Sequence, residues 1–514
     1  MATKAADNRY RRVKYNQTKY GASSSLERLV WDFSFDWDGD GNFDNNEASR
    51  VLALSVDRGR TNFIKPRGEG YEPVKTGQCK ITLSNHDGRY DGWNSDSPLY
   101  PNVTYGKDVR VRVRDMNTGT VHPVFYGVIS NIEPTGYGTN REVIITLEDG
   151  WRFLREYNAR VALQENITLD DAIGMVLDYI GWPARWGRAL DISSDTIPHW
   201  WASGDKKAGS ELEDLVNSFL GYFFIAADGS ATYQKRQSVG GSVVDLYQSQ
   251  LLKDISNPVP WQFHRNVTRF RVHPRLVAST GTVWQFEGDN PSVPVGGSTT
   301  LWANYSYLNS PCPAKNVVTP VASTDWTANT SSDGSGTDKT ADVSFSFTDF
   351  GDTAKLTFTN NSGVVVYIIS PKIRGDAVYA PYTTDVTYPA DPASVSQPRE
   401  LFVDLPWQQD INVAINFAEV IGPFMDGLHP FPAVQLEGRP SLQFPPDLFD
   451  IITLTSDTLG IGGTSFRVSG IRHESLSSMQ AFRTIFTLEP YLSKEGFWTW
   501  DTASVFDSST VFGW

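Results

Sequence analysis

The chain has 514 residues, of which 40% are hydrophobic and 13% aromatic, and its formal net charge is −14. At roughly 150 residues per domain this length predicts three or four domains, and the hydrophobic content excludes an intrinsically disordered protein. The acidic balance argues against a sequence-tolerant nucleic-acid binder, which needs a basic surface to displace counterions. The polar, basic start predicts no signal peptide and no run reaches the ~18 apolar residues of a membrane span, so we expect a soluble chain made in a cytoplasm.

The first part of the chain is predicted as a basic arm followed by β structure. Residues 1–27 are polar and basic, and such an arm either stays solvated or orders against an acidic neighbour. Residues 28–155 form a first β-barrel-like domain of short strands separated by Gly, Asn and Asp turns. Within it, KDVRVRVRD (107–115) alternates valine with arginine, which predicts a strand with one buried face.

Residues 156–254 are predicted as an α+β domain built on a pair of helices. The first helix, about 168–181, has Thr168 as its N-cap and apolar residues at helical spacing. The second, about 210–221, has Ser210 as its N-cap and the same arrangement of apolar residues.

The second half of the chain is again predicted as β structure. Residues 276–375 are poor in Lys and Arg and rich in Ser, Thr, Gly and Val, which is typical of an inserted β-sandwich. The flanking spans, 255–275 and 376–490, are predicted as a second β-barrel-like domain with a helix at about 411–422. The aromatic tail 491–514 is expected to dock on a neighbouring surface. The fold class is therefore mainly β with a small α+β part: two β-barrel or meander domains, a helix-pair domain and a sandwich.

Two blocks, 107–149 and 449–489, share the order strand, Gly turn, strand, long loop, strand. Chance similarity between β meanders is the alternative to a true duplication. If the blocks are duplicates, a ring has twice as many units as subunits, so a trimer presents a quasi-sixfold surface. The alignment matches Asp108 with Asp450, Glu133 with Glu474 and Thr146-Leu147-Glu148 with Thr487-Leu488-Glu489, and it leaves Gly127-Val128 one residue out of step with Gly470-Ile471.

The segment DWDGDGNFDNNE (36–47) matches the calcium-loop pattern at every fixed position. Hard oxygen donors around a flexible loop suit Ca²⁺, which here would be a structural ion. The preceding LVWDFSF is typical of a strand and not of an EF-hand helix, and a metal-free turn is the alternative. The expected oxygen donors are Asp36, Asp38, Asp40, Asn42, Asp44 and Glu47.

We expect no catalytic residues, no organic cofactor and no enzyme activity. The seven histidines show no paired-ligand spacing, and neither a nucleophile elbow nor a phosphate loop occurs in the right context. Cys79 and Cys312 fit no metal or redox spacing and are expected to be free thiols. The run His199-Trp200-Trp201 is expected in a core or interface, with a sugar-stacking platform as the alternative.

The order of several segments resembles that of minor tail and tail-hub proteins of long-tailed bacteriophages. The resemblance covers most of residues 28–490 apart from the insert. The segments are, in order, FDWDGDGNFDNNEASRVLALSVDRGR, ITLSNHDGRYDGWNSDSPLYPN, GKDVRVRV, VFYGVISNIEP, LEDGWRFLRE, ITLDDAIGMVLDYIGWP, SELEDLVNSFLGYFFIAADGSATYQKR, HRNVTRFRVHPR, DPASVSQPRELFVDLPW and FRVSGIRHE.

This resemblance implies a structural virion protein of the tail tip, assembled in the host cytoplasm. The implied assembly is a homotrimeric, baseplate-hub-like ring with two tail-tube-like domains per chain, which adapts a sixfold tail tube to a threefold tip and forms part of the DNA channel. The implied partners are tail-tube or distal tail proteins, other tail-tip proteins and the tape measure protein. Viral DNA would be met only in passage, and no membrane insertion is implied.

Two other functions are kept as alternatives. The first is a receptor- or glycan-binding tail protein that uses the 276–375 sandwich. The second, with less support, is a cell-wall hydrolase. Many relatives carry a C-terminal peptidoglycan hydrolase or fibre-binding region, and neither is recognised in the sequence up to Trp514.

Overall fold

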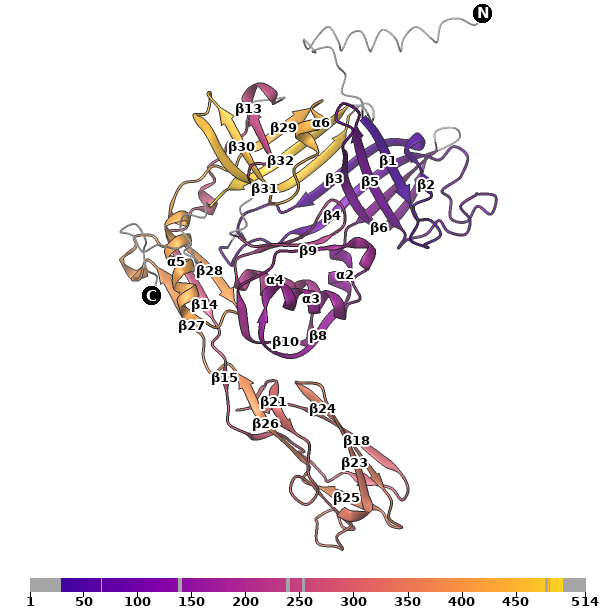
Figure 1. Cartoon of the computed structure of the whole chain (residues 1–514), viewed down its shortest axis with the longest axis vertical. Helices are drawn as coiled ribbons and strands as arrows, with labels where there is room; N and C mark the ends of the chain where they lie inside the picture. The colour runs from indigo at the N-terminus through magenta and orange to yellow at the C-terminus, as the bar shows by residue number, and fades with distance from the viewer. Residues whose placement is uncertain are drawn as a thin grey trace, which may run out of the picture.

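The computed structural model describes residues 29–65, 67–136, 141–236, 241–251, 255–476, 479 and 481–492. The predicted arm 1–27 and nearly all of the predicted tail 491–514 lie outside the described residues. The described chain is mainly β with few helices, as the sequence predicts. Figure 1 shows a large sheet at the top, a helical layer below it and an elongated insert at the bottom.

One 12-stranded sheet unites both predicted barrel-like modules. Its path is β13-β30-β31-β3-β4-β7-β6-β5-β1-β2, and β32 joins β31 to β29. Among the described residues none of the sheets closes into a barrel, so the predicted barrels are open meanders that share a sheet. The strands are β1 (Leu29–Phe35), β2 (Asn45–Asn46), β3 (Val51–Gly59), β4 (Lys75–Ser84), β5 (Asp108–Asp115), β6 (Val121–Thr135), β7 (Glu142–Glu148), β13 (Val244–Tyr247), β29 (Ala433–Glu437), β30 (Ile451–Ser456), β31 (Ile461–Ser475) and β32 (Phe482–Pro490).

The two meanders bury separate hydrophobic cores beneath the shared sheet. The alternation predicted for β5 is confirmed, because Val109, Val111 and Val113 are fully buried whereas the intervening arginines are partly exposed. Alternating strands of this kind bury one face and leave the other available for contacts.

A helical layer packs below the sheet through a third core, which contains several tryptophans. The predicted cap of α3 is confirmed, since the hydroxyl of Thr168 accepts a hydrogen bond from the amide of Asp171. The predicted cap of α4 is wrong: the helix begins before Ser210, because Ala208 and Gly209 are buried and a Cβ on Gly209 would lie 3.0 Å from the ring of Trp151. The elements are α2 (Trp151–Glu156), β8 (Asn158–Thr168), α3 (Leu169–Tyr179), β9 (Arg188–Leu190), β10 (Thr196–Lys207), α4 (Ala208–Ser218), β11 (Tyr222–Ile225) and β12 (Ala231–Gln234).

The spans 255–275 and 376–490 contribute strands to two sheets. Besides the strands of the large sheet they supply a three-stranded sheet that packs on a helix around its own core. The Asp410 cap of that helix is confirmed, and the helix runs past the predicted end to Asp426 with Pro423 inside it. These elements are β14 (Val267–Val272), β27 (Thr384–Tyr388), β28 (Glu400–Leu405) and α5 (Ile411–Asp426).

The insert consists of short antiparallel strands around a separate core that includes Trp326 and Phe358. It projects away from the large sheet (Figure 1). Ion pairs join its base to β8, with Arg160 to Asp352 at 3.0 Å and Lys315 to Glu165 at 3.3 Å. Its main strands are β16 (Gly281–Gln285), β18 (Ser298–Asn304), β21 (Ala314–Val318), β22 (Thr327–Asn329), β23 (Val343–Asp349), β24 (Thr353–Asn360), β25 (Val366–Ile369) and β26 (Lys372–Tyr379).

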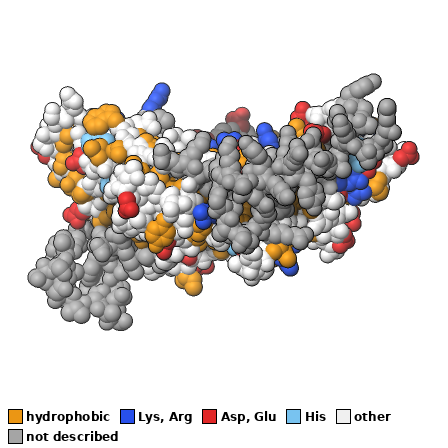
Figure 2. Space-filling view, turned by 90° about the horizontal axis from the view of Figure 1, so that it is seen from above, with side chains coloured by type: hydrophobic (Ala, Val, Ile, Leu, Met, Phe, Trp, Pro, Cys, Tyr) orange, Lys and Arg blue, Asp and Glu red, His pale blue; other side chains and the backbone are white. Residues whose placement is uncertain are grey.

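The surface is mixed in character. From above, Figure 2 shows acidic and basic side chains scattered singly among polar and hydrophobic ones on the part that is not grey. None of the described helices combines the length and the apolar character that a bilayer span requires.

Candidate functional site

Two parts of the large sheet repeat the same strand order and the same hydrogen bonds. Module 1 runs β4-β7-β6-β5 and module 2 runs β29-β32-β31-β30. The amide of Gly106 donates to the carbonyl of Ile129 at 2.8 Å, and the amide of Phe449 donates to the carbonyl of Val468 at 2.7 Å. Gly106 and Phe449 both have a positive φ, 79° and 63°. A bulky residue such as Phe449 rarely adopts a positive φ. Its doing so at the position where module 1 has Gly106 indicates duplication.

Each module also carries a β-bulge at an equivalent serine. The pairing of β6 with β7 skips Ser130, and the pairing of β31 with β32 skips Ser469. The hydroxyl of Ser130 donates to the carbonyl of Thr146, and the hydroxyl of Ser469 donates to the carbonyl of Thr487, both at 3.1 Å. Bulges are specific features that families keep and that β patterns in general do not share. We therefore infer that the two modules are true duplicates.

The structure corrects part of the sequence alignment. The match of Thr146-Leu147-Glu148 with Thr487-Leu488-Glu489 is confirmed by the pairing around the two bulges. The remaining matches are wrong by one to several residues, because strands with a period of two look alike when they are shifted. The hydrogen bonds and the bulges instead match Lys107 with Asp450, Glu133 with Arg472 and Asn131-Ile132 with Gly470-Ile471.

The outer edge of the long middle strand is covered in one module and open in the other. In module 2, residues 470–474 of β31 pair with residues 55–59 of β3. The equivalent residues of β6, 131–135, pair with β7 on one edge, while the pairing with β5 on the other edge stops at Val128. In the described part of the chain no strand covers this other edge of 131–135. Asn131 and Glu133 are exposed there.

Residues 256–260 form a short extended segment that lies beside β29, as β3 lies beside β4 in the other module. The amide of Ala433 donates to the carbonyl of Ser256, and the amide of Phe431 donates to the carbonyl of Pro258, both at 2.8 Å. Ser256 pairs with Ala433, which lies opposite Thr487 of β32, and Ser55 pairs with Lys80, which lies opposite Thr146 of β7. Because Thr487 and Thr146 are equivalent, Ser256 is equivalent to Ser55.

The far edge of this segment is open as well. Alternate residues of a strand direct their backbone groups to opposite edges, so Asn257 and Val259 present theirs away from β29. Val259 is 47% exposed, and Pro258 beside it is exposed as well. Within the described residues, these two open edges correspond to the two strands that pair, β31 and β3, where the duplicate is covered. We therefore expect them to be complementary.

Buried ion pairs fix the junction between the modules. Arg60, which follows β3, binds Glu489 of β32 at 2.6 Å, and their side chains are 5% and 2% exposed. Arg58 binds Asp447 at 2.8 Å and donates to the carbonyl of Ile225 at 2.7 Å. Because buried charges are costly without partners, these pairs specify how β3 meets module 2.

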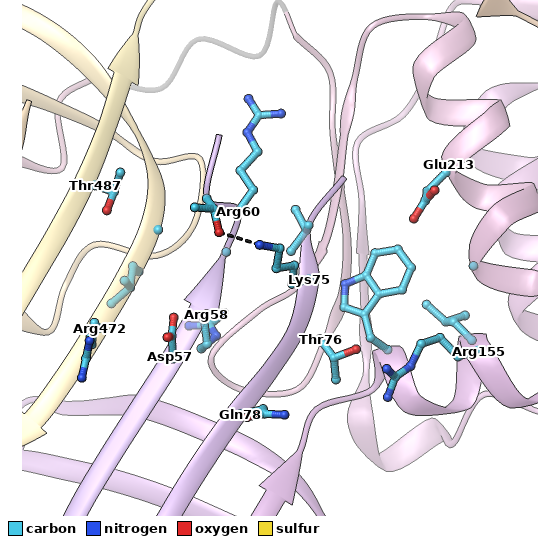
Figure 3. Close-up of a pocket in the computed structure, with 18 of the residues that line it drawn as sticks. Asp57, Arg58, Arg60, Lys75, Thr76, Gln78, Arg155, Glu213, Arg472 and Thr487 are labelled. Carbon is cyan, nitrogen blue, oxygen red and sulfur yellow. Dashed lines mark hydrogen bonds between the residues drawn. The ribbon is translucent and has the colours of Figure 1, made fainter. Parts of the chain in front are cut away.

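A cavity of about 890 Å³ lies between this junction and the helices α2 and α4. In Figure 3 the strand side carries Arg58, Arg60 and Lys75, and Glu213 faces them from the helix side. The basic groups already have acidic partners, for example Lys75 with Glu72 at 3.3 Å. Burial raises the pKa of Glu213 to about 7.

The predicted metal residues are brought together only in part. The carboxylates of Asp36, Asp38 and Asp40 lie within 4.8 Å of one another. Asp36 accepts hydrogen bonds from the amides of Gly39 at 2.8 Å and Gly41 at 3.0 Å. Burial raises the pKa of Asp36.

The other three predicted ligands lie outside this carboxylate group. Asn42 donates to Asp40, which lowers the pKa of that carboxyl, and Asp44 is exposed. The carboxylate of Glu47 is buried and accepts from Tyr90 at 2.7 Å and Arg89 at 2.9 Å. Sequence spacing could not anticipate these partners of Glu47, since they lie more than forty residues away.

Other residues singled out in the sequence have structural surroundings. Cys79 and Cys312 are free and buried, as expected. Trp200 is fully buried in the core of the helical layer, and Trp201 packs on Trp407 with ring centroids 5.2 Å apart. The core interpretation of this run is therefore confirmed for Trp200.

No protein-family model matches the chain, and no curated protein matches its sequence. Among solved structures, it is similar to a tail protein from Neisseria meningitidis MC58, with 12% identity and a TM-score of 0.48, over 89% of this chain and 96% of that chain. It is also similar to the 43 kDa tail protein of prophage MuSo2 from Shewanella oneidensis, with 9% identity and a TM-score of 0.49, over 90% and 98% of the two chains. A prophage tail protein from Listeria monocytogenes EGD-e has 8% identity and a TM-score of 0.41, over 89% and 94%. The structures similar to this chain thus include phage tail proteins, the class that the sequence resembles.

Proposed function

We propose that the protein is a structural component of a phage tail tip, a homotrimeric hub that adapts a sixfold tail tube to a threefold end. The observation that carries this proposal is the duplicated module with two open, complementary strand edges in one chain. The order of segments in the sequence, which resembles that of tail-hub proteins, supports the location. The role is mechanical, and no catalytic step is part of it.

In the proposed ring, the open edge at residues 131–135 of one copy pairs with residues 256–260 of the next. The duplicate gives the register, because 470–474 pair with 55–59 inside one chain. Glu133 then lies opposite Pro258, and Ile132 opposite Val259.

The contact is short and specific. Ile132 and Val259 exchange two backbone hydrogen bonds, whereas the next pair, Pro134 with Asn257, forms only one because Pro134 lacks an amide. Proline on an exposed edge limits unwanted pairing. The edge therefore favours one partner register over open-ended aggregation.

Ring closure follows from the type of contact. The two edges differ, so the interface is head-to-tail and closes only when its rotation divides a full turn. Three copies place six modules around an axis, which matches a sixfold tube on one side and a threefold tip on the other.

The neighbours we propose are tail-tube or distal tail proteins, other tail-tip proteins and the tape measure protein, after assembly in the host cytoplasm. DNA passes through the ring without stable binding. A net charge of −14 disfavours tight phosphate contacts and supports that part of the proposal.

The proposal is tested by the mass of the purified protein in solution together with its position in the virion. We expect three times the chain mass by light scattering, and antibody label or density at the tail tip. A monomer at all concentrations combined with label along the tail side or on the capsid would refute the hub.

We also propose that Asp36, Asp38 and Asp40 hold a structural Ca²⁺, with Asn42, Asp44 and Glu47 as the remaining ligands of the sequence pattern. The three gathered carboxylates support this proposal. Full engagement of all six requires Glu47 to leave Arg89 and Tyr90.

Calcium should raise the melting temperature of the protein and chelator should lower it, with one ion per chain by elemental analysis. Asp38→Ala should remove the response because it deletes the oxygen donor, and Asp333→Ala, in an exposed loop of the insert, should keep it. Identical melting with Ca²⁺ and with chelator, and no bound metal, would exclude the ion.

A further inference from the structure

The outer face of one sheet of the insert is polar except for one tryptophan. In the sheet β18-β24-β23 the outward side chains are hydroxyl-bearing or charged, and the hydroxyls of Thr300 and Thr357 lie 3.1 Å apart across two strands. Trp302 stands on this same face and is 61% exposed. Its ring is not part of the hydrophobic core of the insert, so core packing does not explain it.

Trp302 borders a hollow of about 540 Å³ between β18 and the end of β16. Trp284 and Phe286 also line this hollow, and their rings pack edge to face with centroids 6.2 Å apart. The lining also includes the exposed Gln285 and Glu287. The hollow thus combines aromatic surfaces with amide, carboxylate and hydroxyl groups.

The orientation of Trp302 is fixed by its neighbours. The ring of Phe350 stacks on it with centroids 5.9 Å apart and planes 26° apart. The ammonium group of Lys355, its cross-strand partner, lies 5.9 Å from the ring centre. A ring held in this way presents a rigid surface, which reduces the entropy lost on binding.

We propose that this hollow is a carbohydrate-binding site. One face of a sugar ring carries C–H groups that pack on an aromatic ring, and its hydroxyls need donors and acceptors nearby. The hollow offers both, in a volume typical of small-ligand sites. Glu287 in its lining and Lys355 beside Trp302 carry opposite charges, which suits a neutral glycan better than a nucleic acid.

This inference goes beyond the structural role of the hub. It gives the insert a binding function that a ring subunit does not need. Glycan binding and the hub role can be tested separately, because the hollow and the open strand edges share no residue.

The test is binding of the full chain to an array of oligosaccharides of glucose, galactose, mannose, rhamnose and N-acetylglucosamine and of bacterial polysaccharides. Hits are repeated by calorimetry with Trp302→Ala, Trp302→Phe and Trp93→Ala. Trp93 is 76% exposed in module 1 and is the matched control. Melting curves verify that each variant is folded.

We expect at least one glycan to bind, about tenfold or more weaker binding by Trp302→Ala and partial retention by Trp302→Phe, because stacking needs a flat ring. Trp93→Ala should bind like the unchanged protein. No glycan bound by the unchanged protein, or equal binding by Trp302→Ala, overturns the proposal. If Trp302→Ala instead loses binding to a protein of the tail while the unchanged protein binds no glycan, the hollow is a protein contact and the proposal is overturned.

Discussion

Equivalent residues of the two modules have different surroundings at the scale of single side chains. Glu148 and Glu489 occupy the same position after the bulge pairing. Glu148 lies near the surface and binds Arg155 at 3.1 Å, with side chains 22% and 56% exposed. Glu489 binds Arg60 in the interior. The two equivalent glutamates therefore allow a buried ion pair to be compared with an exposed one.

Removing the charge of Glu489 should destabilise the protein strongly. Glu489→Gln leaves Arg60 charged and buried, and we expect the free energy of unfolding to fall by about 3–5 kcal/mol. Glu148→Gln should cost less than about 1 kcal/mol, because its partner stays in water. Denaturant unfolding of both variants measures the difference, and equal losses would contradict the assignment of the junction.

The cavity should make stability depend on pH through Glu213. Its pKa is raised to about 7 by burial, so the folded state binds more protons than the unfolded state between about pH 4.5 and 7. Stability therefore falls as the pH rises through this range. Glu213→Gln should raise the free energy of unfolding at pH 8 by on the order of 1 kcal/mol, and so raise the melting temperature. The same substitution should raise the free energy of unfolding much less at pH 5. The exposed Glu419→Gln on α5 is the control, and a gain that is the same at both pH values would contradict the account.

At the scale of elements, β3 is the strand that joins the modules. Its last residue, Gly59, has a φ of 108°, and a Cβ there would lie 2.3 Å from the carbonyl oxygen of Ser469. Only glycine allows the chain to pass the bulge of β31 this closely.

Gly59→Ala should therefore disrupt the junction by several kcal/mol, since backbone shift is added to an unfavourable φ. Gly106→Ala is the matched control, because Gly106 has a φ of 79° with no atom within 4 Å of the added Cβ. It should cost about 1–2 kcal/mol. Thermal unfolding measures both, and equal effects would show that the close approach at Gly59 is unimportant.

The sequence predicted helices and strands well where residues close in the chain determine them, as in strand alternation and helix caps. The alternation of β5, the caps at Thr168 and Asp410 and the order of strands in both modules agree with the structure. The pairing of β3 with β31 was not predictable, because it joins residues more than four hundred positions apart. The start of α4 was missed because burial of Ala208 against the helical layer outweighs the capping preference of Ser210.

For the candidate sites, the sequence located the acidic loop but not its neighbours. It could not show that Arg89 and Tyr90 hold Glu47, since only the fold brings them together. The open edges were likewise hidden, because an edge is defined by which strands fail to pair. The hollow at Trp302 depends on β16 and β18 lying side by side, which no local pattern predicts.

At the scale of the whole molecule, the described part of the chain has one covered pair of these edges, β31 with β3, and two open edges of the same kind. A chain that satisfies one such contact internally leaves the second for a neighbour. The insert projects away from the large sheet, beyond the helical layer (Figure 1).

The most direct test is a disulfide across the proposed edge. Glu133→Cys combined with Pro258→Cys places two cysteines opposite each other between copies, and the buried Cys79 and Cys312 do not compete. The control combines Glu133→Cys with Val259→Cys, whose side chains would point to opposite faces of the sheet. Under mild oxidation we predict covalent dimers and trimers for the first pair and monomers for the second on a non-reducing gel. Monomers for both pairs in the assembled protein, or equal cross-linking of both, would contradict the pairing of these edges.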